Sequence, residues 1–330
     1  MYRICKARQQ LKEILNKLKV YLEGFSEYFF NSLAQSATNY GIRIVQDVKN
    51  CDIRITLDPT ELLAINKSRD IIILAEPEVV RPDLYKSKIL ESSIKILPVG
   101  RYRAERLALK NWIEIPPEIP SYSRSQSDHR KQFAVVNEHK FSSSYRSNYG
   151  LRRKVIRYFE KNRPLDLDVY GKEWNTTKLL ELKRRYSQIK NNRSILQIDV
   201  KECFSDLWRH YKSISGHMSR EGSGLQNYEF NICIENDIDY ISEKVWKALY
   251  AGSIPIYVGP NLIHDPELRK CVVPSTNKLT ALIKVIENLD EINANELRQN
   301  AIDLLDNIND SKYSIDNINH LFYTNLLEII

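Results

Sequence analysis

Short apolar runs alternate with amphipathic helical patterns along most of this chain, and this alternation constrains its fold more than any other feature. The runs "DIIILAEPE", "YEFNICIEN" and "SIPIYVGP" have the length of buried strands and end at proline, glycine or polar residues. Between such runs lie segments with helical periodicity, for example "SEKVWKALYAG", whose final glycine is typical of a helix C-terminus. Strands that alternate with helices form βαβ units, so we predict an α/β fold with mostly parallel sheets.

The chain of 330 residues is longer than a single hydrophobic core usually supports, which favours two domains. The stretch "IPPEIPSYSRSQSDHRKQ", residues 115–132, replaces apolar periodicity with proline, serine and charge, as linkers do. We therefore expect one domain in residues 1–124, a second in residues 125–305, and a C-terminal helix in residues 306–330 that packs back on the first domain. Two successive α/β units of this kind predict two Rossmann-like domains facing across a cleft.

Several common classes of binding site leave no signature in this sequence. It contains no G-x-G-x-x-G and no Walker A motif, and its five cysteines include no C-x-x-C pair, so neither a disulfide framework nor a zinc site is indicated. No stretch approaches the roughly 20 apolar residues of a membrane span. The formal net charge is +7, and the positive excess is concentrated between Arg101 and Arg220. That excess suggests an anionic partner: nucleic acid, a membrane surface or a phosphorylated small molecule.

Residues 1–25 predict a basic amphipathic helix, because apolar residues recur there at helical spacing. Such a helix packs on its own domain or anchors a protein peripherally to a membrane, and the residues leave both interpretations open. The segment lacks the continuous apolar core of a signal peptide. Together with the odd number of cysteines, this leads us to expect a cytoplasmic protein, with membrane association as an alternative. The apolar stripe consists of Leu11, Ile14, Leu15, Leu18 and Leu22.

An unusually charged turn, "ENDIDYISEK", separates an apolar strand from a helix within residues 227–260. In open α/β sheets, ligands bind beyond the carboxyl ends of the strands, which is where this turn lies. Lys244 falls in the first turn of the expected helix, where a cation opposes the helix dipole. Either a phosphate or diphosphate binds between Lys244 and the helix N-terminus, or Lys244 is solvated while Glu243 pairs with Lys247.

The same segment resembles the donor-binding signature of the α-1,3-fucosyltransferases, glycosyltransferase family 10. That signature runs roughly F-x-F-x-L-x-F-E-N-S, then D-Y-x-T-E-K, then A-L-x-A-G and P-V-x-x-G. Ser242 stands where the family usually has threonine, and "ENDIDY" is shorter between Asn236 and Tyr240 than is usual, which leaves the donor sugar open. The matching residues are Tyr228, Phe230, Glu235, Asn236, Asp239, Tyr240, Glu243, Lys244, Ala248, Leu249, Ala251, Gly252, Pro255 and Gly259.

The resemblance extends upstream and covers residues 70–273 well. The run "FAVVNEHK" is similar to the first strand of the family's donor domain, and "VYGKEWN" is similar to its D-x-Y-G strand end. Within "SNYGLRRKVIRYF", Arg152 matches the arginine that contacts the donor diphosphate, with Arg153 as the alternative. Within "DIIILAEPEVVRPDLY", Glu76 matches the family's proposed catalytic base, with Glu78 as the alternative.

The resemblance implies an inverting glycosyltransferase of GT-B architecture, which moves fucose from GDP-fucose to a glycan hydroxyl in an α-1,3-type linkage. Negative charge grows on the leaving diphosphate, and Arg152 and Lys244 would stabilise it. Glu76 follows an apolar strand, where partial burial would raise its pKa and suit it to accept a proton as the general base. The resemblance also implies a set of donor-binding residues: Arg152, Glu235, Asn236, Tyr240, Glu243 and Lys244.

The resemblance implies no cofactor beyond the donor substrate and no essential divalent metal. Asp166 and Asp168 in "LDLDVY" form a D-x-D pattern, which we interpret as structural because it lies in an expected strand. The expected partners are a nucleotide-sugar donor, a glycan acceptor and, through the basic N-terminal helix, a membrane surface, but not nucleic acid. Three alternatives are a transferase for another nucleotide sugar, a nucleic-acid-binding module motivated by "LRRKVIRYFEKNR", and a non-catalytic glycan-binding protein.

Overall fold

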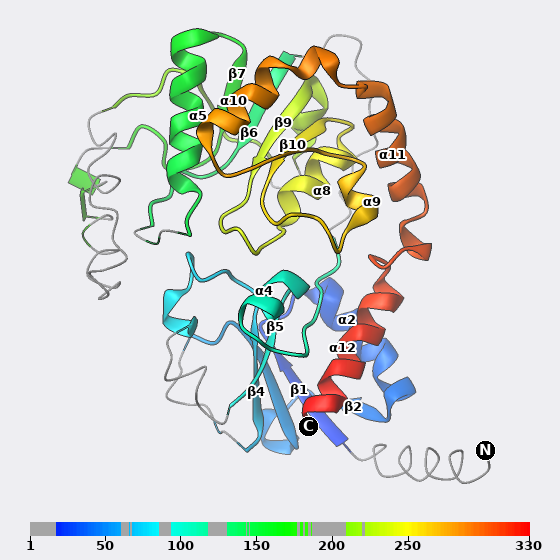
Figure 1. The fold of residues 1–330 in the computed structure, drawn as a ribbon. Coiled ribbons are helices and arrows are strands. Elements are labelled where there is room, and N and C mark those ends of the chain that lie inside the picture. The colour runs from blue at the N-terminus through cyan, green and yellow to red at the C-terminus, as the bar shows by residue number, and fades with distance from the viewer. Residues whose placement is uncertain are drawn as a thin grey trace. The chain divides into compact units, whose positions relative to one another are not determined.

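The computed structural model describes residues 18–60, 66, 68–85, 94–117, 131–142, 144, 146–176, 179–180, 182–183, 186, 209–219 and 222–330. The chain divides into two compact units. The first contains the described residues up to Pro116 together with Ile308–Ile330, and the second contains those from Pro117 to Asn307. The chain therefore leaves the first unit, forms the second and returns to the first, as the colours in Figure 1 show.

A parallel sheet with the strand order β2-β1-β3-β4-β5 forms the centre of the first unit. All of its neighbouring strands run in parallel, which confirms the α/β class expected from the alternation of strands and helices. Strand β4 is buried along its whole length, as expected of the apolar run "DIIIL". The strands are β1 (Leu18–Glu23), β2 (Ile42–Ile44), β3 (Ile53–Leu57), β4 (Asp70–Leu74) and β5 (Lys95–Pro98).

Residues 18–23 are a strand, so the prediction of an amphipathic helix is wrong for this part of residues 1–25. Leu18 and Leu22 fit helical spacing, but Val20 lies between them, so the same residues also alternate with the period of a strand. Pairing with both β2 and β3 buries Val20 and Leu22 and satisfies the backbone, which decides between the two patterns. Residues 1–17 and most of the helix expected in "DPTELLAINKS" lie outside the described residues.

Helices α2 and α12 pack together in the first unit, where α12 (red in Figure 1) lies beside α2 (blue). The Phe29 and Phe322 rings meet edge to face with centroids 6.2 Å apart. The Tyr323 hydroxyl donates a hydrogen bond of 2.6 Å to the carbonyl oxygen of Leu33. These contacts join the C-terminal helix to the core of the first sheet. The helices of this unit are α2 (Glu27–Ser36), α4 (Arg101–Arg106) and α12 (Ile315–Ile329), with 3₁₀ helices η1 (Ala37–Tyr40), η2 (Val48–Asn50), η4 (Pro82–Tyr85) and η8 (Ile308–Asp310).

The second unit is built on another parallel sheet, with the strand order β11-β10-β9-β6-β7-β8. Its strands are β6 (Lys131–Val136), β7 (Leu167–Tyr170), β8 (Ile214–Gly216), β9 (Tyr228–Ile234), β10 (Ile254–Val258) and β11 (Val273–Ser275). Its helices are α5 (Tyr149–Asn162), α8 (Glu243–Tyr250), α9 (Pro266–Arg269), α10 (Leu279–Glu287) and α11 (Ala294–Asp306), with 3₁₀ helices η6 (Ser223–Asn227) and η7 (Leu289–Glu291).

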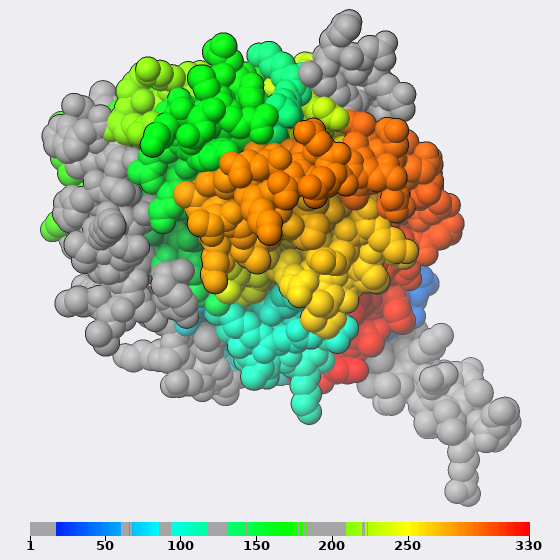
Figure 2. Space-filling model, turned by 45° about the horizontal axis from the view of Figure 1, so that its top comes forward, coloured from blue at the N-terminus to red at the C-terminus, as the bar shows by residue number. Residues whose placement is uncertain are grey.

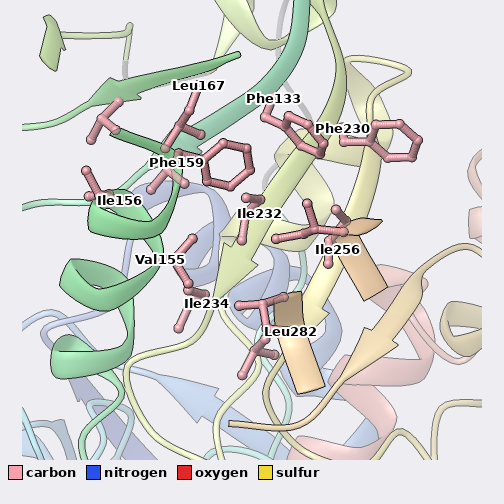
Figure 3. Packing of buried hydrophobic residues seen from close by; sticks show 14 of the residues in the cluster. Phe133, Val155, Ile156, Phe159, Leu167, Phe230, Ile232, Ile234, Ile256 and Leu282 are labelled. Carbon is pink, nitrogen blue, oxygen red and sulfur yellow. The ribbon is translucent and has the colours of Figure 1, made fainter. Parts of the chain in front are cut away.

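Apolar side chains of α5, α10 and the central strands form the core on one face of the second sheet. Figure 3 shows Phe133 of β6 and Phe230 of β9 near Phe159 of α5; the Phe133 centroid is 5.0 Å from that of Phe159 and 5.7 Å from that of Phe230. In Figure 2, α10 (orange) lies against α5 (green) over this core. On the opposite face, Ala134 packs with Ala251, which follows α8.

The chain reverses its direction of winding between β6 and β9 of the second sheet. Strand β7 lies on one side of β6 and β9 lies on the other, so the connections after β6 and β9 leave the sheet in opposite directions. Ligands of open α/β sheets bind at such a point, beyond the carboxyl ends of the strands. The two connections are residues 137–148 and 235–242. Among the described helices, none is both long and apolar enough to cross a membrane.

Candidate functional site

The carboxylate of Glu235, directly after β9, holds the charged turn together. Glu235 is 0% exposed. Its Oε1 accepts a hydrogen bond of 2.8 Å from the backbone N–H of Ser242, and its Oε2 accepts one of 2.6 Å from the Ser242 hydroxyl. Burial raises the pKa of Glu235, although Lys244 and Ser242 act in the opposite direction. Two charge-assisted hydrogen bonds from one residue thus connect the end of β9 to the start of α8.

Lys244 is folded back over the N-terminus of α8. Its Nζ donates a hydrogen bond of 2.8 Å to the Ser242 hydroxyl and lies 3.5 Å from Oε2 of Glu235. Ser242 is also the N-cap of the helix, since its hydroxyl accepts a hydrogen bond from the backbone N–H of Lys244 at 3.3 Å. The Lys244 side chain is 15% exposed, so the interpretation of Lys244 as a solvated cation is wrong. A buried carboxylate offsets the unfavourable position of this cation in the helix dipole.

Glu243 occupies the exposed side of the same helix turn, with 47% of its side chain accessible. Its Oε1 lies 3.8 Å from Nζ of Lys247, so the i,i+4 pair expected from the sequence does form. Partial burial alone would raise the pKa of Glu243, but the ammonium groups of Lys244 and Lys247 lower it below its usual value. Glu243 is therefore ionised at neutral pH and accessible to a ligand.

Arg152 of α5 reaches the end of β9 from the other side of the site. It is 3% exposed, and its Nη2 donates hydrogen bonds to the carbonyl oxygen of Ile234 at 2.6 Å and to Oδ1 of Asn236 at 2.8 Å. Its guanidinium carbon lies 4.9 Å from the centroid of the Tyr149 ring. Burial lowers the pKa of Arg152 to about 10, which still leaves it charged at neutral pH. Arg153 is equally buried, but its Nη1 donates to a carbonyl oxygen in the connection after β6.

The segment between Asn236 and Tyr240 is joined to the connection that precedes α5. The backbone N–H of Asn148 donates to the carbonyl oxygen of Asn236 at 3.2 Å. Arg146 contacts the carboxylates of both Asp237 and Asp239, at 2.7 Å and 3.0 Å from its Nη2. Asn236 and Tyr240 are themselves half-buried. The sequence patterns did not identify Arg146, because Asp237 is 91 residues away in the chain and no spacing rule connects the two.

Asn137, the first residue after β6, is a second contributor that the patterns did not identify. It is 4% exposed, and within the described part of the chain neither its amide nitrogen nor its amide oxygen has a hydrogen-bond partner. A buried amide without partners is uncommon in proteins and is typical of a position where a ligand completes the hydrogen bonds. The neighbouring Glu138 pairs with Lys140 at 2.9 Å, and this hydrogen bond lowers the pKa of Glu138. A polar residue directly after a buried strand was the available signal.

Glu76 lies in the first unit, two residues beyond β4, and its backbone is firmly held. Asp58 accepts hydrogen bonds from the N–H groups of Ala75 at 3.0 Å and Glu76 at 2.8 Å. The fully buried Arg103 donates to the carbonyl oxygen of Ala75 at 2.8 Å, and the Tyr85 hydroxyl donates to that of Glu76 at 2.8 Å. Burial raises the pKa of Asp58, although the two N–H groups oppose the shift. Asp58 thus supports Glu76, a role that the sequence patterns did not indicate.

The two glutamates considered for the general base have different surroundings. Glu76 is half-buried beyond the carboxyl end of β4, an interior strand of its sheet. Glu78 forms an ion pair with Arg106, whose Nη1 lies 2.8 Å from its Oε2, and both side chains are partly exposed. The carboxylate of Glu78 is therefore engaged by Arg106.

The aspartates of the D-x-D pattern are occupied by protein groups. Asp168 of β7 accepts hydrogen bonds from Lys131 at 2.7 Å, from Ser215 at 2.9 Å and from the Tyr228 hydroxyl at 2.5 Å. Asp166 forms its own ion pair of 2.8 Å with the arginine that follows α5. In the described residues, no group of three or more His, Cys, Asp or Glu side chains is arranged to hold a metal ion.

The site of the second unit therefore combines two cations, the buried Arg152 and the largely covered Lys244, with the N-terminus of α8 and the amide of Asn137, which has no hydrogen-bond partner among the described residues. Backbone N–H groups and cations at a helix N-terminus favour an anion, above all a phosphate or diphosphate. The exposed carboxylate of Glu243 is suited to accept hydrogen bonds from hydroxyl groups or from a base. Arg152 and Arg153 are buried against their own unit, so they do not present a basic surface to a nucleic-acid duplex.

Comparisons with known proteins agree with this geometry. Residues 138–268 match the family model described as "Glycosyltransferase family 10 (fucosyltransferase) C-term". The fold is similar to a crystal structure of an α1,3-fucosyltransferase, with a TM-score of 0.50 at 13% identity over 94% of this chain and 90% of that one. It is also similar to a glycosyltransferase from Rickettsia africae ESF-5, with a TM-score of 0.53 at 12% identity over 95% and 99%.

A further structure of similar fold is Anabaena Alr3699/HepE in complex with UDP and glucose, with a TM-score of 0.52 at 10% identity over 94% of this chain and 100% of that one. At such identities the likeness concerns the fold, and together with the two parallel sheets it confirms the GT-B fold class. The family match covers the turn with Glu235 and Lys244 as well as α5 with Arg152. Residues 138–268 thus match the model of glycosyltransferase family 10, the fucosyltransferases, and the chain is a glycosyltransferase.

Proposed function

We propose that this glycosyltransferase moves fucose from GDP-fucose to a hydroxyl group of a glycan, in an α-1,3-type linkage and with inversion at the anomeric carbon. The observation that carries the proposal is the pair of cations at the carboxyl end of β9, the buried Arg152 and the largely covered Lys244. The family match supports the choice of fucose, because the description of the matched model is that of fucosyltransferases. The side chains of Asn236, Tyr240 and Glu243 can all form hydrogen bonds to ribose or a base, which supports a nucleotide as the leaving group.

The leaving diphosphate is the group that these cations would stabilise. As the bond between the anomeric carbon and the β-phosphate oxygen breaks, negative charge increases on that oxygen. Lys244 supplies a compact charge beside the N–H groups at the start of α8, and Arg152 supplies a planar guanidinium. Charges that act more strongly on the transition state than on the bound donor raise kcat. No metal ion is required in this proposal, because the cations belong to the protein.

The acceptor hydroxyl must lose a proton as its oxygen attacks the anomeric carbon, and we assign the role of general base to Glu76. In one displacement the new C–O bond forms, the bond to the β-phosphate breaks, GDP departs, and the proton passes to the Glu76 carboxylate. Asp58 and Arg103 hold the backbone around Glu76, so its side chain starts from a defined position. Such positioning is what a general base needs in order to act without a large entropic cost.

The remaining proposed donor contacts divide into direct and supporting ones. Glu243 is exposed and ionised, which suits contact with ribose hydroxyl groups or the base, and Asn236 and Tyr240 lie in the adjoining segment. Glu235 has no exposed surface, so in this proposal it acts on the donor through Ser242 and Lys244. An acidic residue in this position holds Lys244 in place, because Nζ of Lys244 lies 3.5 Å from Oε2 of Glu235 and donates to the Ser242 hydroxyl.

A donor panel with the purified protein tests the proposal. Nucleotide release from GDP-fucose, GDP-mannose and UDP-sugars is measured in the presence of a mixed pool of glycan acceptors. We expect more nucleotide release from GDP-fucose than from the other donors. The rate of release should fall by on the order of 100-fold in Lys244→Ala. It should stay at the wild-type rate in Lys284→Ala, which changes an exposed lysine of α10 and serves as the matched control. If Lys244→Ala turns over at the wild-type rate, Lys244 does not stabilise the leaving diphosphate.

A transferase for another nucleotide sugar is the second candidate, and the short segment between Asn236 and Tyr240 favours it. A shorter segment at this place changes the space available to the sugar or the base but leaves the contacts to the diphosphate unchanged. The similar fold of HepE, whose structure contains UDP and glucose, is the reason for including UDP-sugars in the panel. Release from a UDP-sugar or GDP-mannose in preference to GDP-fucose would establish this alternative.

Peripheral membrane contact through residues 1–17 remains a proposal, which vesicle sedimentation tests.

A further inference from the structure

The short segment after β9 turns its acidic side chains inward. In the sequence Asn236-Asp237-Ile238-Asp239-Tyr240, the side chains of Asp237 and Asp239 are 0% and 7% exposed. The apolar Ile238 between them is 40% exposed. This is the reverse of the usual preference, in which carboxylates face water and isoleucine is buried. A segment folds in this way only where a specific partner compensates for the burial of the charges.

Arg146 is that partner. Its side chain is 9% exposed, and it contacts Asp237 through two nitrogens, Nη2 to Oδ1 at 2.7 Å and Nε to Oδ2 at 3.3 Å. The same Nη2 lies 3.0 Å from Oδ2 of Asp239. Burial and the nearby charge of Asp239 raise the pKa of Asp237, and Arg146 opposes that shift. The planar guanidinium suits such a paired contact in a way that the single ammonium of lysine does not.

Arg146 lies in the connection after β6, whereas its partners lie in the connection after β9. These two connections separate at the point where the sheet changes its direction of winding. Two other hydrogen bonds join them: the backbone N–H of Asn148 to Asn236 at 3.2 Å, and Arg152 to the side chain of Asn236 at 2.8 Å. Those bonds hold the start of the segment, and Arg146 holds its middle.

We propose that Arg146 is a positioning residue for donor binding, which holds residues 236–240 in their bound conformation and neutralises the two carboxylates that would otherwise repel a nucleoside diphosphate. The proposal deepens the proposed function and rests on it, since it concerns the same anionic site. Without Arg146, two negative charges would lie in a segment that also carries the donor contacts Asn236 and Tyr240. Like charges at short range and in a poorly solvated site disfavour the binding of an anion.

The test compares Arg146→Gln, Arg146→Lys and the control Arg298→Gln. The control removes a partly exposed pair of 3.0 Å with Glu229, at the opposite end of β9. Titration calorimetry gives the Kd of GDP and UDP, and steady-state assays give the donor KM and kcat. We expect Arg146→Gln to raise the Kd of GDP and the donor KM by on the order of 100-fold, with a much smaller change in kcat at saturating donor. Arg146→Lys should recover part of the affinity, and Arg298→Gln should leave it unchanged.

Hydrogen exchange of the free protein supplies a readout that needs no ligand. The backbone N–H of Ile238 donates to Oδ1 of Asp237 at 2.6 Å, so release of this carboxylate should accelerate exchange within residues 236–240 in Arg146→Gln and much less in Arg146→Lys. Exchange that stays at the wild-type rate in this segment would overturn the inference, as would an unchanged Kd. If Arg146→Gln does not fold, Arg146→Lys carries the same two measurements with a smaller expected change of about tenfold in Kd.

The two proposals fail in different ways. If wild-type protein binds GDP and Lys244→Ala loses that binding while Arg146→Gln retains it, the proposed function stands and the role of Arg146 is wrong. If wild-type protein binds neither GDP nor UDP, the proposed function is wrong, and the donor-binding role of Arg146 falls with it. Faster exchange in Arg146→Gln would then support only the contact between Arg146 and residues 236–240.

Discussion

Ser242→Ala removes a single hydroxyl group that serves three partners. That hydroxyl donates to the fully buried carboxylate of Glu235 at 2.6 Å, accepts from Nζ of Lys244 at 2.8 Å, and accepts from the backbone N–H of Lys244 at 3.3 Å as the N-cap of α8. Ser242 is 4% exposed, so water does not readily replace the lost contacts. The variant should therefore lower both the stability of the second unit and its affinity for a nucleoside diphosphate.

The expected loss follows from the separate contributions. Loss of an N-cap hydroxyl costs about 1 kcal/mol. Loss of a hydrogen bond to a buried ionised group costs roughly 1.5–3 kcal/mol. The terms overlap, because the backbone N–H of Ser242 at 2.8 Å and Lys244 continue to stabilise Glu235. A total of about 2–4 kcal/mol is thus expected, and a loss of ~3 kcal/mol corresponds to a fall of about 6–12 °C in the Tm of a unit of this size.

Urea unfolding and thermal melting measure the change, with GDP titration for the affinity. Ser242→Thr retains the hydroxyl and should lose less than about 1 kcal/mol. Ser253→Ala is a matched control, because Ser253 is also buried, but its hydroxyl makes a single long hydrogen bond of 3.4 Å with the described residues. A Ser242→Ala protein within ~0.5 kcal/mol of wild type, or a threonine variant as unstable as the alanine variant, would refute the reasoning.

Arg152→Lys should weaken GDP binding by about tenfold or more, because an ammonium cannot replace the planar guanidinium; calorimetry that finds equal affinity contradicts this. Glu235→Gln should remove a pH dependence. Burial raises the pKa of Glu235 above its ordinary value of 4.5, so the native state binds more protons than the unfolded state. The stability of the wild type therefore falls relative to that of the variant as pH rises from 4.5 through the raised pKa. If the free energies of unfolding of the wild type and of Glu235→Gln, measured in urea, change with pH in parallel, the raised pKa of Glu235 is contradicted. In Asp58→Gly the glycine accepts the positive φ of 43°, but the N–H groups of Ala75 and Glu76 lose their hydrogen-bond acceptor. The free energy of unfolding, measured in urea, should fall by about 2–4 kcal/mol, and kcat should change more than the donor KM. An unchanged kcat argues against Glu76 as the base.

The elements that carry the site were predictable because local pattern and tertiary structure agree there. "YEFNICI" alternates large apolar residues with Glu229, Asn231 and Cys233, and it becomes the central strand β9. The serine before "EKVWKALY" caps α8, and Gly252 follows the helix with a φ of 69°. The periodicities of 2 and 3.6 residues were each unambiguous in these segments. The family resemblance singled out Glu235, Glu243 and Lys244, and their order along one turn explains why they lie close together in the structure.

The contacts between distant segments were not predictable in the same way. Arg146 and Asp237 are 91 residues apart, and their contact depends on which strands become neighbours. Asp58 and Glu76 are 18 residues apart and meet because β3 and β4 end side by side. Strand β1 was misassigned because its short run fits both periods, and pairing with two neighbours decided the outcome. Topology sets such contacts, and a spacing rule does not.

The return of the chain to the first unit has a consequence for the order in which the protein is made. Phe322 and Tyr323 of α12 are fully buried in the core of a unit whose sheet is formed by the beginning of the chain. A ribosome therefore completes all the described strands of the second unit before it supplies the helix that the first unit lacks. Multidomain chains commonly fold from the N-terminus during synthesis. Here the unit that is translated first is the last to be finished, and its open sheet face needs protection until the final helix arrives.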